Sequence, residues 1–561
     1  MNDNPLIVQG DLTILVDLSA PRYADARDAL ARFAELVKSP EHIHTYRITP
    51  LSIWNACAAG VPVDEITETL TAFSRFPVPA SITNQVRDFA GRFGRLRVVR
   101  DDADPAADHL LLYASDVHLA EELAHGRQLA SLLGDRIAPT IFRIRQGDRG
   151  RIKQALIKAG YPAEDVAGYT DGESLEVSLR RETSAGADFA LRDYQVQAVH
   201  AFYAQGSARG GSGVVVLPCG AGKTVVGMGV ISAVQSSTLI LTTSVTAVRQ
   251  WIRELLDKTD ISPDDIGEYS ATTKDVRPIT VATYQILTHR ASKEAEFTHL
   301  ALFDERNWGL IIYDEVHLLP APVFQITATL QARRRLGLTA TLVREDGRED
   351  DVFALIGPKK ADVPWKVLER QGWIATAVCT EVRVALADDL RMPYAMAESR
   401  NKFRVASENG DKVQVVRDII ARHPGEPALI IGMYVDQLEA LATEMHVPLI
   451  TGTTPQAKRD VLYEQFRSGA LPALVVSKVA NFAIDLPDAS LAIQVSGTFG
   501  SRQEEAQRLG RILRPKPGAN QAHFYSIVTA DTVEQEFALK RQLFLCEQGY
   551  EYAIVDAHAL T

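Results

Sequence analysis

The segment 218–224 reads PCGAGKT, a combination of glycines, lysine and threonine suited to binding phosphate. Its glycines let backbone N–H groups approach a phosphate without an intervening Cβ. The Lys223 ammonium can reach the outer phosphates of a nucleotide. The Thr224 hydroxyl can ligate Mg²⁺ at the start of a following helix, whose dipole also favours the anion. The segment predicts a site for ATP and Mg²⁺ made by Gly220, Ala221, Gly222, Lys223 and Thr224.

An acidic pair, Asp314 and Glu315, follows the apolar run 310–313 further along the chain. An acid at the carboxyl end of a strand is placed to hold Mg²⁺ beside a phosphate-binding loop, and a second acid can orient or deprotonate the attacking water. We therefore assign Asp314, with Thr224, to the metal and Glu315 to the water. An acidic pair alone is more often a surface turn, but the preceding phosphate-binding segment favours the catalytic interpretation. We expect His317 to couple domains through a hydrogen bond.

Two later segments carry hydroxyl and guanidinium groups that could serve the same site. Thr339 and Thr341, in a Thr-Ala-Thr run, can link a nucleotide site to a second ligand. Residues 507–514 read QRLGRILR, and arginines three residues apart share a face if the segment is helical. An exposed basic helix is the alternative. Because a second domain must supply charge across the nucleotide cleft, we expect a catalytic contribution here, with the arginines as arginine fingers, a role worth ~10³–10⁵ in rate. The residues concerned are Gln507, Arg511 and Arg514.

Short apolar runs rich in β-branched residues alternate with helical patterns from about residue 191 onward. The first set lies at residues 214–217, 238–241, 279–282 and 310–313, and the second at 428–431, 473–476 and 491–495. Short, fully apolar strands are typical of parallel sheets that helices cover on both faces. We therefore expect two α/β domains, joined near residues 370–400, which position the motifs.

The residues before these domains have a different character. Residues 1–140 read as a mostly helical α+β module and carry 13 Lys and Arg against 19 Asp and Glu. Residues 141–158 reverse this balance, with six basic side chains against Asp148 alone. A phosphate-facing patch and a solvated helix face both explain this basic run. The stretch 168–188 is rich in Gly, Ser and Glu and reads as a connector.

The composition excludes several classes of protein. A length of 561 residues suggests three or four domains, and 46% hydrophobic with 23% charged residues is ordinary for a globular protein. A net charge of −11 excludes a protein whose whole surface binds nucleic acid, but it allows a local basic groove. We expect no membrane segment, because no apolar run approaches ~18 residues. The polar start and four scattered cysteines favour a cytoplasmic location.

The ordered motifs PCGAGKT, DEVH, TAT and QRLGRILR together resemble those of superfamily 2 helicases. The match is closer to the XPB (xeroderma pigmentosum group B) family, whose Arg-Glu-Asp motif corresponds to residues 344–346. The segments 42–46, 49–54, 401–404 and 500–514 are also similar to that family, so the resemblance covers nearly the whole chain. It implies two RecA-like P-loop helicase domains in tandem, with a mostly helical α+β module before them.

The resemblance also implies roles for further residues. In the segment 191–195, Arg192 and Gln195 would lie near the adenine. The Arg-Glu-Asp motif would support strand separation, although a surface charge cluster is the alternative, since the same three residue types recur at 348–350. We expect Trp251 to lie in the core rather than to stack on a base. The residues expected to act on DNA are Thr243, Ser244, Thr283, Arg344, Glu345 and Asp346.

Two segments depart from the family pattern. Ala480 and Asn481 stand where the family usually has Gly-Asp, while Asp485, expected to couple the sites, is retained. The resemblance therefore implies no acidic contact from this position. The segment 380–400 is short beside the inserted thumb of XPB proteins, so processivity can differ.

We therefore expect five segments along the chain. They are the amino-terminal module at 1–140, a basic segment and connector at 141–188 that is a candidate part of a DNA- or damage-recognition domain, the ATP-binding RecA-like domain at 189–370, a linker with a short thumb at 371–400, and the second RecA-like domain at 401–561.

The expected activity is that of a monomeric, ATP-dependent DNA helicase with 3′-to-5′ polarity. Its substrates would be single-stranded, forked or duplex DNA, in nucleotide excision repair or in transcription-linked opening, with a repair nuclease or another repair protein as candidate partner. One alternative is a translocase on duplex DNA that does not unwind it. Another is an ATP-gated scaffold that recruits a nuclease and hydrolyses little ATP.

Overall fold

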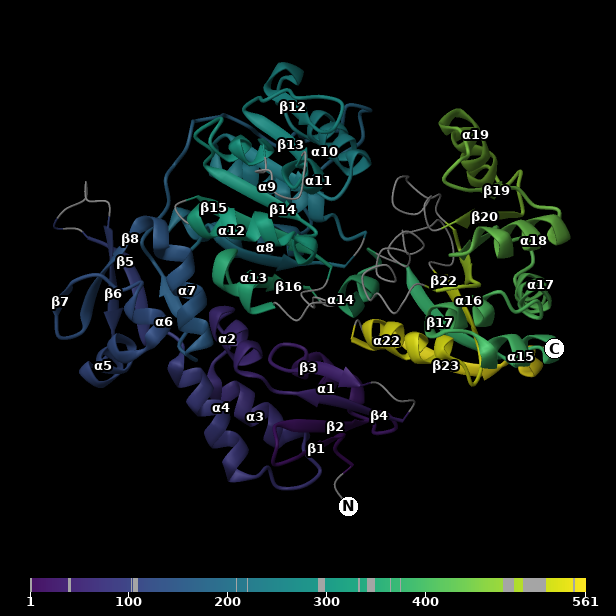
Figure 1. Cartoon of the computed structure of the whole chain (residues 1–561), viewed down its shortest axis with the longest axis horizontal. Helices are drawn as coiled ribbons and strands as arrows, with labels where there is room; N and C mark the ends of the chain where they lie inside the picture. Colours follow the sequence, from purple (N-terminus) through teal and green to yellow (C-terminus); the bar gives the residue numbers. More distant parts are fainter. Residues whose placement is uncertain are drawn as a thin grey trace.

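The computed structural model describes most of the chain in four sheets and their helices (Figure 1). The described residues are 3–38, 42–101, 103, 109–207, 209–218, 220–290, 298–330, 333–340, 349–363, 365–373, 375–477, 489–497, 521–547 and 550–560. Within these ranges no helix is both long and apolar enough to cross a membrane.

The amino-terminal sheet is antiparallel and has the order β1-β2-β4-β3. Its strands are β1 (Leu6–Val8), β2 (Thr13–Asp17), β3 (Glu35–Lys38) and β4 (Ile43–Arg47). It shares one apolar core with the helices α1 (Tyr23–Leu30), α2 (Pro50–Ala58), α3 (Val63–Phe73) and α4 (Ala80–Arg92). Helix α2 begins where Pro50 fixes the first turn and the Thr49 hydroxyl accepts a hydrogen bond from the Ser52 N–H at 3.0 Å.

A second small sheet has the order β7-β8-β6-β5-β9. Its strands are β5 (Leu96–Arg100), β6 (His109–Ala114), β7 (Arg136–Ala138), β8 (Ile141–Arg145) and β9 (Ala163–Asp165), accompanied by α5 (Val117–His125), α6 (Arg127–Ala130) and α7 (Arg149–Lys158). Strands from both sides of residue 140, the module boundary expected from sequence, hydrogen-bond in this sheet. The charge reversal near residue 140 therefore does not coincide with a boundary between sheets.

The basic run 141–158 forms β8 and α7 and divides into exposed and buried cations. Arg149 Nη2 lies 2.6 Å from Asp165 Oδ1, and Lys153 Nζ lies 2.9 Å from Asp165 Oδ2. Their side chains are only 2% and 7% exposed. The run is therefore neither one phosphate-facing patch nor one solvated face, because two of its cations neutralise a buried carboxylate. The four exposed cations are Arg143, Arg145, Arg151 and Lys158.

The first large sheet is parallel throughout, with the order β12-β13-β11-β14-β15-β10-β16. Its strands are β10 (Ser212–Val216), β11 (Thr238–Thr242), β12 (Ile266–Tyr269), β13 (Ile279–Thr283), β14 (Leu310–Asp314), β15 (Arg334–Thr339) and β16 (Lys359–Asp362). Because strand side chains alternate, Val215 and Ile312 pack in the core with α8 (Asp193–Tyr203), α9 (Lys223–Val234) and α10 (Val245–Lys258). Val214 and Ile311 pack on the other face with α11 (Tyr284–Leu287), α12 (Ala321–Thr329) and α13 (Glu349–Leu355).

The second large sheet is also parallel, with the order β19-β20-β18-β21-β22-β17-β23. Its strands are β17 (Thr376–Val384), β18 (Ala428–Gly432), β19 (Leu449–Ile450), β20 (Ala473–Ser477), β21 (Leu491–Gln494), β22 (Gln521–Thr529) and β23 (Glu551–Asp556). Among its helices are α16 (Ser399–Ser407), α17 (Lys412–Arg422), α18 (Val435–Met445), α19 (Gln456–Arg467) and α22 (Val533–Glu547). These two parallel sheets confirm the expected α/β class.

The segment 371–400, expected as linker and thumb, contributes regular structure to the second domain. It supplies β17, which pairs with β22 on one side and β23 on the other, and α15 (Asp388–Met396). The sequence did not indicate this strand, because the pairing partners of β17 lie more than a hundred residues further along the chain.

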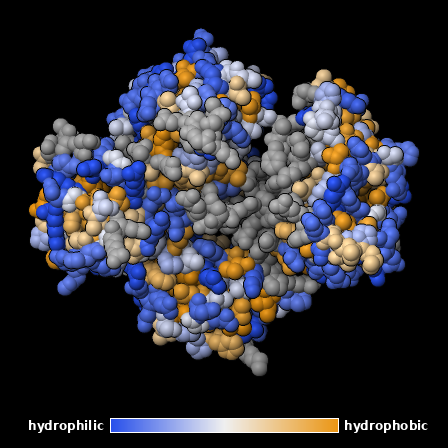
Figure 2. Space-filling model, in the orientation of Figure 1, coloured by the Kyte–Doolittle hydropathy of each residue, from blue (hydrophilic) through white to orange (hydrophobic). Residues whose placement is uncertain are grey.

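Figure 1 shows the four sheets with their helices as four neighbouring groups of elements, with β5, β6, β7 and β8 at the left of the view. The first parallel sheet is at the top of the view, the second at the right, and the amino-terminal sheet at the bottom, where α22 lies beside β3. Cys546 of α22 packs into the amino-terminal core. The face drawn in Figure 2 is mostly hydrophilic, with apolar residues scattered among polar ones.

Candidate active site

The predicted phosphate-binding segment lies between the end of β10 and the start of α9. Gly222 precedes the first residue of α9 and has φ of +79°, in the left-handed region that favours glycine. A Cβ at this position would stand 2.6 Å from Gln195 Nε2, so the close packing here also requires glycine. Lys223 and Thr224 then begin α9, where free backbone N–H groups and the helix dipole favour a phosphate.

Residues of α8 support this loop from beneath. The Tyr194 hydroxyl and Gln195 Nε2 both donate to the Ala221 carbonyl oxygen, at 2.7 and 3.0 Å. Gln195 Oε1 accepts a hydrogen bond from the Arg192 N–H at 2.9 Å, so both ends of the amide are engaged in a side chain only 3% exposed. The Arg192 guanidinium lies 4.2 Å from the centre of the Trp373 ring. The contact of both residues with adenine stays a prediction, and the sequence reasoning missed Tyr194 and Trp373 as their partners.

The acidic pair stands beside the lysine, as the sequence predicts. Asp314 is the last residue of β14, and Glu315 follows it with φ of +51°, a left-handed conformation that non-glycine residues rarely adopt. Lys223 Nζ lies 3.3 Å from Glu315 Oε1. The structure therefore brings together the candidates for phosphate binding, metal binding and water activation.

Burial and neighbouring charges shift the pKa values of the two carboxyl groups in opposite directions. Burial, reinforced by the charge of Glu315, raises the pKa of Asp314 to about 6. Burial would raise the pKa of Glu315 as well, but the charges of Lys223 and His317 bring it below its usual value. Glu315 is therefore the more acidic member of the pair and is ionised at neutral pH, the state in which a carboxylate can orient water and accept its proton.

The sequence reasoning missed two groups that hold Asp314 in place. The Trp251 indole Nε1 donates to Asp314 Oδ2 at 2.9 Å, and the Tyr284 hydroxyl donates to the Asp314 carbonyl oxygen at 3.0 Å. The Trp251 ring is in the core, at 1% exposure, as expected. Since a buried indole N–H usually has a hydrogen-bond partner, the expectation of a buried Trp251 could have prompted a search for one.

The structure brings His317 and Thr339 into contact. The 2.7 Å separation between His317 Nδ1 and Thr339 Oγ1 is a hydrogen bond, and the same nitrogen lies 3.6 Å from Glu315 Oε2. Thr339 ends β15, and its side chain is buried. The loop after β14 and the end of β15 are therefore connected by one hydrogen bond within the first parallel-sheet domain, and the expected coupling of domains by His317 stays a prediction.

Three of the candidates for DNA contact lie at the edge where neighbouring strands β11 and β13 end. Thr243 and Ser244 follow β11, and Thr283 ends β13, paired in register with Thr242. The hydroxyls of Ser244 and Thr283 accept hydrogen bonds from the Ala247 N–H at 3.2 Å and the Ile286 N–H at 3.3 Å, and so cap α10 and α11. Two helix amino termini at one edge can contact a phosphate backbone through N–H groups.

Eight candidate residues lie outside the described residues, so their positions stay predictions. They are Thr341, Arg344, Glu345, Asp346, Asp485, Gln507, Arg511 and Arg514. The same holds for Ala480 and Asn481. Among the described residues, the Thr224 hydroxyl and the Asp314 carboxylate are hard oxygen ligands of the kind that Mg²⁺ prefers, and they fit the metal that the sequence predicts.

Comparison with known proteins gives matches along most of the chain. Family models match at residues 6–138 (Helicase conserved C-terminal domain), 188–344 (Type III restriction enzyme, res subunit) and 368–560 (ERCC3/RAD25/XPB C-terminal helicase). A protein of Kineococcus radiotolerans named DNA 3'-5' helicase XPB is 53% identical over 99% of this chain and 97% of its own length.

More distant proteins also match. The XPB helicase/translocase subunit of general transcription and DNA repair factor IIH from Enterocytozoon bieneusi is 32% identical over 99% of this chain and 93% of its own length. The solved structure of the ATP-dependent Type ISP restriction-modification enzyme LlaBIII bound to DNA superposes with a TM-score of 0.50 at 13% identity, covering 66% of this chain and 31% of that one. At that identity the likeness concerns the fold alone.

Proposed function

Since this chain belongs to the XPB family of superfamily 2 DNA helicases, we propose that ATP hydrolysis at Lys223, Asp314 and Glu315 drives 3′-to-5′ unwinding of DNA. The observation that carries this assignment is the 3.3 Å contact between Lys223 Nζ and Glu315 Oε1. It joins the lysine of the phosphate-binding loop to the carboxylate best suited to activate water. Chance surface motifs would not meet in a partly buried site.

The side chains divide the work of phosphoryl transfer among them. The N–H groups of residues 220–224 and the Lys223 ammonium bind the outer phosphates. Thr224 and Asp314 would hold Mg²⁺, which would neutralise phosphate charge. Glu315 orients the attacking water and accepts its proton. When phosphate binds, Lys223 exchanges its contact with Glu315 for the phosphate, and this exchange frees the carboxylate before it acts on the water.

The second domain and the DNA complete the cycle in this proposal. Arg511 and Arg514 would stabilise the transferred phosphoryl group from across the cleft, with Gln507 beside them. Thr243, Ser244 and Thr283 would bind the sugar-phosphate backbone of the tracked strand through hydroxyl and backbone N–H groups. The hydrogen bond between His317 and Thr339 would transmit the state of the nucleotide site to the end of β15.

The names of the relatives support the polarity and the setting. The Kineococcus radiotolerans relative is named for 3'-5' polarity, and the Enterocytozoon bieneusi relative for transcription and DNA repair. From these names we propose a role in nucleotide excision repair or in transcription-linked opening. We further propose that the protein is a cytoplasmic monomer and that it works with a repair nuclease or another repair protein. Sedimentation with and without forked DNA tests the monomeric state.

Lys223→Ala is the direct test of the assigned site. We expect it to remove DNA-stimulated ATPase activity, measured with single-stranded, duplex, forked and bubble DNA. Lys258→Ala is a matched control, because this lysine of the same domain also pairs with acids, Glu254 at 2.7 Å and Asp257 at 2.8 Å, but outside the site. Unchanged hydrolysis in Lys223→Ala would overturn the assignment. Near-zero turnover of the unaltered protein on every DNA would favour the scaffold alternative.

A translocase that moves along duplex DNA without separating the strands is the second candidate function. The observation that favours it is the name of the Enterocytozoon bieneusi relative, which includes both helicase and translocase. Strand displacement from forked DNA and displacement of the third strand from a triplex separate the two activities. Triplex displacement without strand displacement would establish translocation alone, whereas strand displacement would support the helicase.

A further inference from the structure

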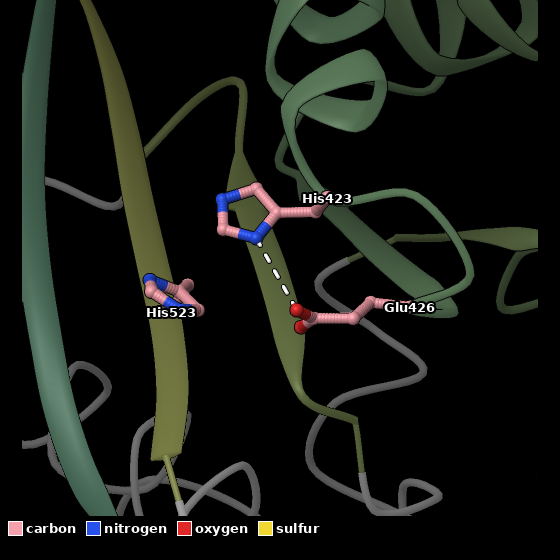
Figure 3. Close-up of side chains that lie close together, drawn as sticks. All are labelled: His423, Glu426 and His523. Carbon is pink, nitrogen blue, oxygen red and sulfur yellow. Dashed lines mark hydrogen bonds and ion pairs between the residues drawn. The ribbon is translucent and has the colours of Figure 1, made fainter. Parts of the chain in front are cut away.

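Two histidines and a glutamate meet in the second parallel-sheet domain, on different elements from those of the nucleotide site (Figure 3). His423 follows the last residue of α17, Glu426 lies in the turn before β18, and His523 is near the start of β22. One ligand atom from each side chain lies within 4.8 Å of the others. Figure 3 shows the three side chains converging on a common space.

The first two members are held together by a tight turn. Residues 423–426 read HPGE, and the Glu426 N–H donates to the His423 carbonyl oxygen at 3.2 Å. Proline at the second position and Gly425 with φ of +82° at the third are the residues of a type II turn. The turn places His423 Nδ1 3.4 Å from Glu426 Oε1. The turn therefore brings the backbones of the two residues together, and their side-chain torsions set the final spacing of the ligand atoms.

The third member stands on a rigid strand opposite the turn. Strand β22 is hydrogen-bonded on both sides, and His523 pairs with Leu491 of β21 and Val378 of β17. The centres of the His423 and His523 rings are 4.3 Å apart, with 51° between their planes. The backbone therefore fixes an imidazole from β22 next to the histidine and carboxylate of the turn.

A tyrosine from the same strand satisfies the remaining nitrogen of His423. Tyr525 lies two residues after His523, so both side chains point to the same face of the sheet. The Tyr525 hydroxyl lies 2.9 Å from His423 Nε2. If Nε2 carries the proton and donates to this oxygen, Nδ1 has a lone pair available on the side of Glu426. Metal-binding histidines usually have such a partner on their second nitrogen.

We propose that His423, Glu426 and His523 bind a Zn²⁺ ion. The ligands are Nδ1 of His423, a carboxylate oxygen of Glu426 and one imidazole nitrogen of His523, with water at the fourth position. Tetrahedral bonds of about 2.0–2.1 Å place ligand atoms ~3.4 Å apart, which is the present spacing of His423 Nδ1 and Glu426 Oε1. Two ligand atoms as far apart as 4.8 Å would have to approach each other by ~1.4 Å to reach this spacing, which side-chain rotation can supply.

The donor set selects the kind of metal. Two imidazoles with one carboxylate suit Zn²⁺ and neighbouring transition metals, whereas Mg²⁺ prefers oxygen ligands throughout. The Glu426 side chain is 36% exposed and gives the ion a path from solvent. Because the ligands come from the α17–β18 turn and from β22, the bound ion would connect two elements that are about a hundred residues apart in sequence.

Zinc titration of the full chain, without a polyhistidine tag, tests the site. The protein is stripped with EDTA, exchanged into buffer with excess Mg²⁺, and titrated with Zn²⁺ by calorimetry and with Co²⁺ by visible absorption. We expect one equivalent of Zn²⁺, a rise of the melting temperature with Zn²⁺, and the absorption of a tetrahedral Co²⁺ complex. His523→Gln and Glu426→Gln should each abolish this binding, and Tyr525→Phe should weaken it by about 10-fold or more.

The matched control is His446→Gln, which replaces an exposed histidine of the same domain at the end of α18. It should leave the stoichiometry and affinity unchanged. Full zinc binding by either ligand variant, or no saturable binding by the unaltered protein, would overturn the proposal. If His523→Gln fails to fold, Glu426→Gln and the stoichiometry of the unaltered protein still decide the question.

Discussion

Removal of the indole N–H that contacts Asp314 should weaken Mg²⁺ binding without removing the ATP site. Trp251→Phe keeps an aromatic ring in the core but deletes the donor that lies 2.9 Å from Asp314 Oδ2. A hydrogen bond to a charged group contributes about 1.5–3 kcal/mol. Each 1.4 kcal/mol corresponds to about a factor of ten, so the half-saturating concentration of free Mg²⁺ should rise about 10- to 100-fold.

The assay is the steady-state ATPase rate at saturating ATP and DNA as a function of free Mg²⁺. At high Mg²⁺ the rate of Trp251→Phe should approach that of the unaltered protein, because the variant retains Lys223 and Glu315. Trp308→Phe is the matched control. Trp308 is also fully buried in this domain, and its indole donates to the Leu302 carbonyl oxygen at 3.0 Å, so the variant tests the cost of the same substitution away from Asp314.

Melting temperatures of both variants separate the binding effect from lost stability. If Trp251→Phe has the Mg²⁺ dependence of the unaltered protein, the indole N–H does not hold Asp314 for the metal. If Trp308→Phe shifts that dependence by the same factor, the effect comes from general loosening of the domain and not from the contact with Asp314.

Three further predictions concern coupling and stability. Thr339→Val keeps the shape of the side chain but removes the hydroxyl 2.7 Å from His317 Nδ1, so DNA stimulation of the ATPase should fall about 5-fold, as for ~1 kcal/mol, with nucleotide affinity unchanged in a fluorescent-analogue assay. Asp165→Ala leaves Arg149 buried beside a second cation, and the melting curve should report a loss of about 3–5 kcal/mol; a loss below 1 kcal/mol contradicts the account. Burial lowers the pKa of His44 from 6.5 to about 4, so the folded state binds this proton more weakly than the unfolded state. The contribution of neutral His44 to the free energy of unfolding should therefore be fully present above pH 6.5 and fall by up to about 3 kcal/mol towards pH 4. In urea titrations over that range, the free energy of unfolding of His44→Gln should depend less on pH than that of the unaltered protein.

The sequence determined what depends on local chemistry. The phosphate-binding loop needs glycine at 222 because of a positive φ, and the apolar runs form buried parallel strands because their residues are apolar on both faces. The motif order was sufficient to indicate the family, which the relatives confirm. The meeting of Lys223 with Glu315 was also predictable, because parallel strands end at one edge of their sheet.

Contacts between distant side chains followed from how the elements pack. Trp251 contacts Asp314, which is 63 residues further along the chain. Arg149 of the basic run pairs with the buried carboxylate of Asp165 and does not face solvent. His423 and His523 lie together only because α17 and β22 pack in one domain. Periodicity and propensity report the conformation within one element, whereas such contacts depend on how elements pack. The sequence therefore indicated the motifs and most strands of the two parallel sheets, and the packing of the elements decided which groups act together.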